Sequence, residues 1–102
     1  MDEGASRGET GETSAAPARV QVRYWAAARA AAGTTADVVE ARTVAEALAA
    51  TRDLHRDDPA FDKVLSVCSV LVGEQPLGGR DPADVAVGDG DVLDVLPPFA
   101  GG

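Results

Sequence analysis

The 102-residue sequence predicts one α+β domain in which a mixed β-sheet packs against one main helix. Strand patterns at residues 19–25 and 92–96 carry this prediction, together with a helix-capping pattern that begins at Thr43. Apolar residues make up 45% of the chain, but aromatic residues only 4%. We therefore expect a core that is mostly aliphatic.

The first part of the domain is expected to hold two strands and a short helix. Residues 19–25 alternate apolar and polar side chains and are rich in strand formers. Residues 26–32 are six alanines and one arginine, which predict a short helix that Gly33 ends. Residues 36–41 predict a second strand. Because so few residues separate the two strands, we expect them to pair antiparallel.

The main helix is predicted to run from Thr43 to about Arg52. Thr43 is a favourable N-cap residue, and Glu46 stands three residues later as its capping-box partner. One side of this helix is formed by residues at helical spacing: Val44, Ala47, Leu48 and Thr51. Asp58 and Pro59 then open a shorter helical segment, whose apolar side holds Phe61, Val64 and Leu65.

The remaining strands are predicted from the last third of the chain. Residues 67–72 form an apolar third strand, and a turn at 73–77 leads to a short edge strand. A tight Gly-Asp-Gly-Asp turn at 88–91 precedes the last strand, residues 92–96, which is apolar as a central strand would be. This order of strand, strand, helix, strand, short strand and strand describes a β-grasp, the ubiquitin-like roll.

Composition and charge exclude several classes of protein. No apolar run approaches the roughly 20 residues of a membrane span. A single cysteine and a single histidine exclude a disulfide framework and argue against a zinc centre. The net charge of −8 argues against a nucleic-acid-binding protein. Six acids against one arginine make residues 74–102 an acidic pole, for which a basic partner surface is the natural complement.

Residues 1–18 are expected to be a disordered N-terminal tail that precedes the domain at 19–102. They contain no aliphatic side chain larger than alanine after Met1, so they bury too little apolar surface to offset the entropy of ordering. They lack a basic start followed by an apolar stretch, so we expect no secretory signal. Together with the lone cysteine, this favours a cytoplasmic location.

The C-terminal segment is the most informative part of the sequence. Pro97 and Pro98 follow the last strand and cannot continue a sheet ladder, so they hold the backbone extended and aim it away from the domain. Phe99 and Ala100 come next. Gly101 and Gly102 lack Cβ atoms and fit a channel too narrow for side chains. We expect this flexible tail to deliver the Gly102 carboxylate into the active site of another protein.

Two segments resemble the ubiquitin-like sulfur carriers, and within them the small subunits of molybdopterin synthase. The first is Val20-Gln-Val-Arg-Tyr-Trp-Ala with Arg29 and Gly33, and the second is the run from Gly88 through Pro-Pro-Phe-Ala-Gly-Gly. The resemblance covers about residues 19–102. The Pro-Pro pair favours molybdopterin synthesis, because carriers of the thiamine pathway usually lack it. Ala30 departs from the family, which often has glutamate there, and residues 1–18 are additional.

The resemblance implies a chemistry at Gly102. A ubiquitin-activating-like adenylyltransferase uses ATP to adenylylate its carboxylate, and a persulfide sulfur donor then converts it to a thiocarboxylate. The large subunit of molybdopterin synthase receives the tail in a heterotetramer and uses the sulfur to build the molybdopterin dithiolene. This chain is then a sulfur-donating subunit and binds no cofactor stably. Two alternatives remain: a carrier for cysteine, thiamine or tRNA thiolation, or a ubiquitin-like protein modifier.

Three other features suggest chemistry but favour structural roles. Cys68 lies in the predicted apolar strand with no basic neighbour, which is typical of a buried structural thiol. His55 lies in a polar stretch without ligand partners and is expected at a solvated helix end. The Gly-Asp-Gly-Asp turn lacks the spaced ligands and the closing glutamate of a calcium loop. Tyr24 and Trp25 face opposite sides of the first strand, so we expect one of them in the core.

Overall fold

The computed structural model describes residues 16–98. Residues 1–15 of the predicted tail at 1–18 lie outside the described residues, as does the segment 99–102. The elements in chain order are β1 (Ala18–Tyr24), α1 (Ala26–Ala32), β2 (Ala36–Ala41), α2 (Val44–Leu54), α3 (Pro59–Ser66), β3 (Ser69–Val72), β4 (Gln75–Pro76), a short 3-10 turn η1 (Pro82–Asp84) and β5 (Val92–Leu96). The predicted α+β class and β-grasp topology are confirmed.

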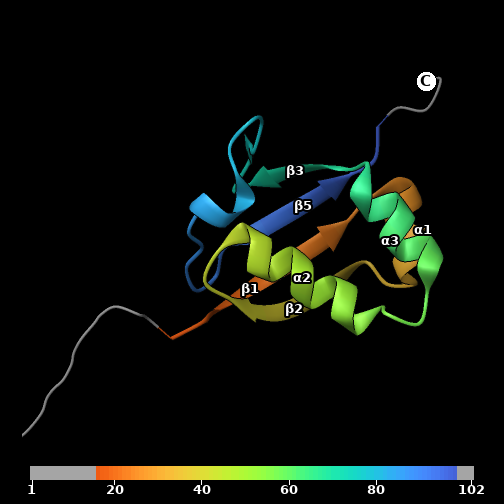
Figure 1. The fold of residues 1–102 in the computed structure, drawn as a ribbon, viewed down its shortest axis with the longest axis horizontal. Coiled ribbons are helices and arrows are strands. Elements are labelled where there is room, and N and C mark those ends of the chain that lie inside the picture. Colours follow the sequence, from red (N-terminus) through yellow and green to blue (C-terminus); the bar gives the residue numbers. More distant parts are fainter. Residues whose placement is uncertain (1–15, 99–102) are drawn as a thin grey trace, which may run out of the picture.

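The sheet has five strands in the order β2-β1-β5-β3-β4, so β5 lies at its centre (Figure 1). β1 and β5 pair in parallel, although about 70 residues separate them in the sequence. The pairs β1–β2, β3–β5 and β3–β4 are antiparallel. The prediction that the last strand is central is therefore confirmed, as is the antiparallel pairing of the first two strands.

The core lies between the sheet and the helices. β1 alternates in burial, with Val20, Val22 and Tyr24 buried. Helix α2 packs across β2 and β1, and α1 and α3 pack on each other beside the end of β1 (Figure 1). These two shorter helices add Ala28 and Phe61 to the same core. The core is aliphatic except for one tyrosine and one phenylalanine, as the composition predicts.

Helix α2 begins as the capping pattern predicts. The Thr43 hydroxyl accepts a hydrogen bond from the Glu46 backbone N–H at 3.2 Å. The Glu46 carboxylate reaches back to the Arg42 N–H at 2.8 Å. The helix continues to Leu54, two residues beyond the predicted end. In α3, Asp58 is the N-cap and Pro59 is the first helical residue, as predicted.

The predicted third strand is wrong at its start. Helix α3 continues to Ser66, Val67 caps it, and the strand begins only at Ser69. An apolar run fits both a helix end and a strand, so periodicity does not separate the two. Cys68 consequently lies in the link between α3 and β3 and not inside a strand.

The packing makes a direct prediction for stability. Leu93 on the central strand is fully buried, so Leu93→Ala should lower the free energy of unfolding by about 2–5 kcal/mol. Val67 is 62% exposed, and Val67→Ala should change it by less than about 0.5 kcal/mol. Urea unfolding of both variants measures the difference, and equal effects would contradict the placement of the core.

Candidate functional site

The base of the C-terminal tail is held by the central strand. Leu96, the last residue of β5, pairs with Ser69 of β3. Pro97 is half-buried and Pro98 is exposed, and neither belongs to a strand. β5 is bonded to β1 on one side and to β3 on the other, so residues 97 and 98 leave the sheet from a fixed point beside α1 and α3 (Figure 1). The predicted site residues Phe99, Ala100, Gly101 and Gly102 lie outside the described residues.

A network of three polar side chains crosses the β1–β5 pair just before this point. Arg23 and Asp94 are register partners, and the guanidinium donates two hydrogen bonds to the carboxylate at 2.7 and 3.1 Å. The Trp25 indole Nε1–H donates to the same carboxylate at 2.8 Å. The Arg23 guanidinium also lies 5.7 Å from the centre of the Trp25 ring, within range of a cation–π interaction.

Asp94 is the centre of this network. It is only 6% exposed, and the hydrogen bond from Arg23 holds the pKa of its carboxyl below the ordinary value of 3.8. Burial opposes this effect, and the hydrogen bond from Trp25 adds to it. Asp94 was not predicted from the sequence as a site residue. One feature of the sequence could have identified it, because Asp94 is a lone carboxylate inside the apolar run Val-Leu-Asp-Val-Leu. A charged side chain that is buried with such a run requires a partner.

Tyr24 and Trp25 lie on opposite sides of β1, as predicted. Tyr24 is 2% exposed, and its hydroxyl donates to Asp37 at 2.7 Å. Burial, and secondly this hydrogen bond, raise the pKa of Tyr24. Trp25 is 41% exposed and lies on the side of the sheet that faces away from the core.

The prediction that His55 lies at a solvated helix end is right about the helix end and wrong about the exposure to solvent. His55 does cap the C-terminus of α2, but its side chain is only 16% exposed. Its Nε2 lies 2.7 Å from the Asp37 carboxylate, and its ring stacks on Phe61 at 4.3 Å between centroids. The loop after α2 folds back toward β2, and this contact is not visible in the local sequence. His55 therefore joins α2, α3 and β2.

Cys68 is half-buried, and its thiol donates a hydrogen bond to the Val64 carbonyl at 3.0 Å. Burial raises the pKa of this thiol, so little of the reactive thiolate is present at neutral pH. Among the described residues, no group of three or more histidine, cysteine, aspartate or glutamate side chains is placed to hold a metal ion. No helix in residues 16–98 is long and apolar enough to cross a membrane.

Comparison with known proteins identifies the family. Residues 22–102 match the ThiS family. The chain belongs to the ThiS family. It is thus a ubiquitin-like protein of the sulfur-carrier group, with the fold that its sequence predicts. A search of curated proteins finds no match.

Solved structures of ThiS-like proteins share this fold at low sequence identity. Small archaeal modifier protein 1 from Methanosarcina acetivorans is 23% identical, with 84% of this chain and 98% of that chain covered and a TM-score of 0.71. Its counterpart from Haloferax volcanii is 24% identical, with coverages of 82% and 99% and a TM-score of 0.67. The complex of subunits 1 and 2 of molybdopterin-converting factor from Helicobacter pylori matches at 23% identity, with coverages of 82% and 99% and a TM-score of 0.58.

The Arg23–Asp94 pair should make the free energy of unfolding depend on pH in the acid range. Because folding lowers the pKa of Asp94, its contribution is present above pH 3.8 and is lost as the pH falls through the lower folded value. At neutral pH, Asp94→Asn should lower the free energy of unfolding by about 1–3 kcal/mol. The difference between wild type and variant, measured by denaturant unfolding, should shrink toward zero in acid. A difference that is independent of pH would contradict the ion pair.

The surroundings of Cys68 predict a slow thiol. In the folded protein, Cys68 should react with an aromatic disulfide reagent at least about tenfold more slowly than in urea at the same pH. Absorbance of the released thiolate measures both rates. Equal rates would mean that the thiol is accessible and not held as described.

Proposed function

We propose that this chain is a sulfur carrier and the small subunit of a molybdopterin synthase. The observation that carries the proposal is the base of the tail: a central strand, followed by Pro97 and Pro98, brings the chain out of the sheet at a fixed point just before its last four residues. The family match includes these four residues. The Pro-Pro pair supports molybdopterin synthesis over the thiamine pathway.

The proposed chemistry takes place at the Gly102 carboxylate. A carboxylate oxygen is a poor leaving group, so an activating adenylyltransferase first joins it to the α-phosphate of ATP, with loss of pyrophosphate. A persulfide sulfur donor then attacks the acyl carbon and AMP leaves, which gives an acyl disulfide between Gly102 and the donor. A thiol then attacks the donor-side sulfur, so that a new disulfide forms on the donor and the thiocarboxylate is released. The chain itself contributes no general acid or base to these steps. Nucleotide is held by the activating partner, and this chain binds no cofactor of its own.

The partner proposed to use this sulfur is the large subunit of molybdopterin synthase, in a heterotetramer. The solved Helicobacter pylori relative is a complex with the second subunit of molybdopterin-converting factor. In our proposal Phe99 and Ala100 are gripped at the entrance of the large subunit, while Gly101 and Gly102 enter a channel shaped for bare backbone. The thiocarboxylate there supplies sulfur to the pterin dithiolene.

Two other functions share much of this evidence. A carrier for cysteine, thiamine or tRNA thiolation would use the same tail. A protein modifier, as the small archaeal modifier proteins are named, would instead join Gly102 to lysines of other proteins. Lys63 is the single lysine of this chain, which makes self-linked chains poor candidates. Mass spectrometry of protein isolated from its host separates the classes, since a thiocarboxylate indicates sulfur transfer and linked targets indicate conjugation.

The position of the last carbonyl should be critical. Adding one residue after Gly102, or deleting Gly102, should abolish thiocarboxylate formation, because one residue moves the carbonyl by roughly 3.3–3.6 Å. A misplacement of about 1 Å already costs on the order of a hundredfold in rate. Gly101→Val should act in the same way through a steric clash. The assay is the mass gained on exchange of oxygen for sulfur, with activating enzyme, ATP and a persulfide donor.

Cys68→Ser is the matched control, because it alters the lone thiol and leaves the tail intact. It should load sulfur as the wild type does, at a small cost in stability from placing a hydroxyl in a half-buried position. Sulfur loading of the extended chain would overturn the role of Gly102. Loss of loading in a folded Cys68→Ser protein would overturn the assignment of the acceptor.

A further inference from the structure

A groove of about 400 Å³ lies between helices α2 and α3 and the hairpin of β3 and β4. Its walls are mostly apolar, with Leu48 from α2, Leu65 from α3, Val70 from β3 and Leu77 from the segment after β4. Leu65 and Val70 belong to the core, while Leu48 and Leu77 are only partly buried against it. The groove therefore opens part of the apolar core to solvent, on the side of the sheet that the helices cover (Figure 1).

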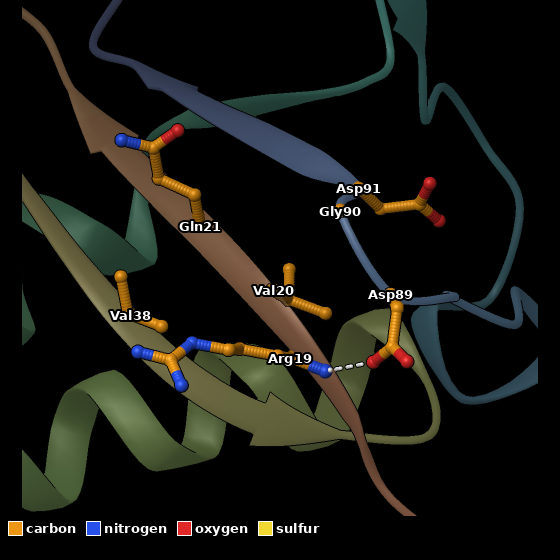
Figure 2. A pocket seen from close by; sticks show the side chains of 7 residues that line it. All are labelled: Arg19, Val20, Gln21, Val38, Asp89, Gly90 and Asp91. Carbon is orange, nitrogen blue, oxygen red and sulfur yellow. Dashed lines mark hydrogen bonds between the residues drawn. The ribbon is translucent and has the colours of Figure 1, made fainter.

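Among the described residues that line this groove, none carries a carboxylate. Arg52 is the one charged residue of the lining, in a chain whose net charge is −8. Two other hollows differ in this respect. One of about 390 Å³, on the opposite face of the sheet, is lined by Arg19 together with Asp89 and Asp91 (Figure 2). Another of about 380 Å³ is lined by three carboxylates and one arginine. A ligand with an apolar side chain and a negative charge is therefore matched by the groove and not by these hollows.

The Arg52 guanidinium is able to bind such a charge. Its Nε donates to the Asp62 carboxylate at 3.0 Å, and both side chains are exposed to solvent. This is its one ion pair among the described residues, and it leaves the terminal nitrogens for another acceptor. Guanidinium groups commonly bind carboxylates through two parallel N–H donors. A carboxylate that enters the groove thus meets a cation at its wall.

The C-terminal tail starts beside this groove. Leu96, the last residue of β5, pairs with Ser69, which lines the groove. Because β5 and β3 are antiparallel, the chain that leaves Leu96 continues past the residues that precede Ser69. Two of these residues, Ser66 and Cys68, also line the groove. Residues 97–98 cover this step, so the first residue of the remaining chain begins close to one end of the groove.

The segment after Pro98 has the chemistry that the groove requires. It consists of Phe99, Ala100, Gly101 and Gly102, and so combines one aromatic ring with a terminal carboxylate three residues later. Four extended residues reach about 13–14 Å from Pro98. An aromatic ring that leaves water for an apolar groove is stabilised there, and two glycines allow the backbone to turn toward a cation.

We propose that this groove is a binding site for the protein's own C-terminal tail, with the Phe99 ring among the leucines of the groove and the Gly102 carboxylate at Arg52. Place, charge and the aromatic ring identify this occupant. The N-terminal segment is a poorer match, because residues 1–15 carry four acids against one arginine and no aromatic residue. The tail of a second copy is disfavoured as well, since two molecules of net charge −8 repel each other.

A tail that is bound in the groove is withdrawn from other proteins. Gly102 cannot reach the active site of a partner while its carboxylate is held at Arg52, so each partner must compete with the groove for the tail. The apparent affinity of that partner is then reduced by the fraction of chains whose tail is free. A thiocarboxylate keeps the negative charge and would be held in the same way. These consequences rest on the proposed function, whereas the binding site itself does not.

Fluorine NMR of the full chain tests the binding site without any partner. Fluorophenylalanine replaces both phenylalanines and gives two signals, which the variant Phe99→Leu assigns. Phe61 is 1% exposed and serves as the internal reference for a buried ring. We expect the shift of the Phe99 signal between H2O and D2O to be less than about half of its value in urea, because the ring is removed from water.

Two arginine variants test the contact with the carboxylate. Arg52→Gln removes the cation and keeps a polar side chain, so it should move the Phe99 signal toward its position in urea and raise its solvent shift at least about twofold. Arg56→Gln is the matched control, because Arg56 is another exposed arginine, pairs with Asp53 and does not line the groove. It should leave the Phe99 signal unchanged.

The outcomes separate this inference from the proposed function. A wild-type Phe99 signal with the full solvent shift would overturn the inference and leave the proposed function standing. Solvent protection that grows with protein concentration would assign the groove to the tail of a second copy and would also overturn it. Equal effects of Arg52→Gln and Arg56→Gln would overturn the role of Arg52 and with it the proposed site. Failure of the wild-type chain to accept sulfur at Gly102 would instead contradict the proposed function, and it would not affect these spectra.

Discussion

The parallel pairing of β1 with β5 is the constraint on which the rest of the structure depends. It joins the start of the domain to its end, with Gln21 opposite Val92 and Tyr24 opposite Val95. The pairing places the last strand in the centre of the sheet, where β3 bonds its other side. The closure of a long loop costs entropy, which the buried core of Val22, Leu93 and their neighbours must offset. The same pairing fixes the point from which the tail leaves.

The alternation of side chains at the end of β1 separates a buried contact from an exposed one. Tyr24 points inward and links to Asp37, which His55 also contacts. Trp25 points outward and links to Asp94. Trp25 directly follows the last residue of β1, so the chain at this point is bonded on the inside through Tyr24 and on the outside through Trp25. The Arg23–Asp94 pair joins the same two strands next to these contacts.

Much of the fold follows from local patterns in the sequence. The cap at Thr43, the proline after Asp58 and the alternation in β1 each specify an element through short-range chemistry, and the structure contains all three. The predicted boundary between α3 and β3 was wrong because the run from Val64 to Val72 is mostly apolar. Such a run is compatible with the spacing of apolar residues in a helix and with that in a strand. The contacts of His55 and Asp94 were missed because their partners lie 18 and 71 residues away. Long-range pairs of this kind depend on register, which local patterns do not specify.

The candidate site divides in the same way. The role of the Gly-Gly tail is a prediction from the sequence alone, since its chemistry depends on residue type and order and not on folding. The polar network of Arg23, Trp25 and Asp94 required the structure, because it is assembled across β1 and β5. Family membership and fold are common to sulfur carriers and modifiers, so neither decides between these uses of Gly102.

The most direct test of the central claim follows one sulfur atom. The chain is loaded at Gly102 with isotopically labelled sulfur and mixed with the large subunit and the cyclic pyranopterin precursor, and the pterin product is analysed by mass spectrometry. Our account predicts that the label appears in the dithiolene of molybdopterin and that the chain returns to its carboxylate form. Label that stays on the chain while molybdopterin fails to form, or a chain that becomes linked to lysines of other proteins, would contradict it.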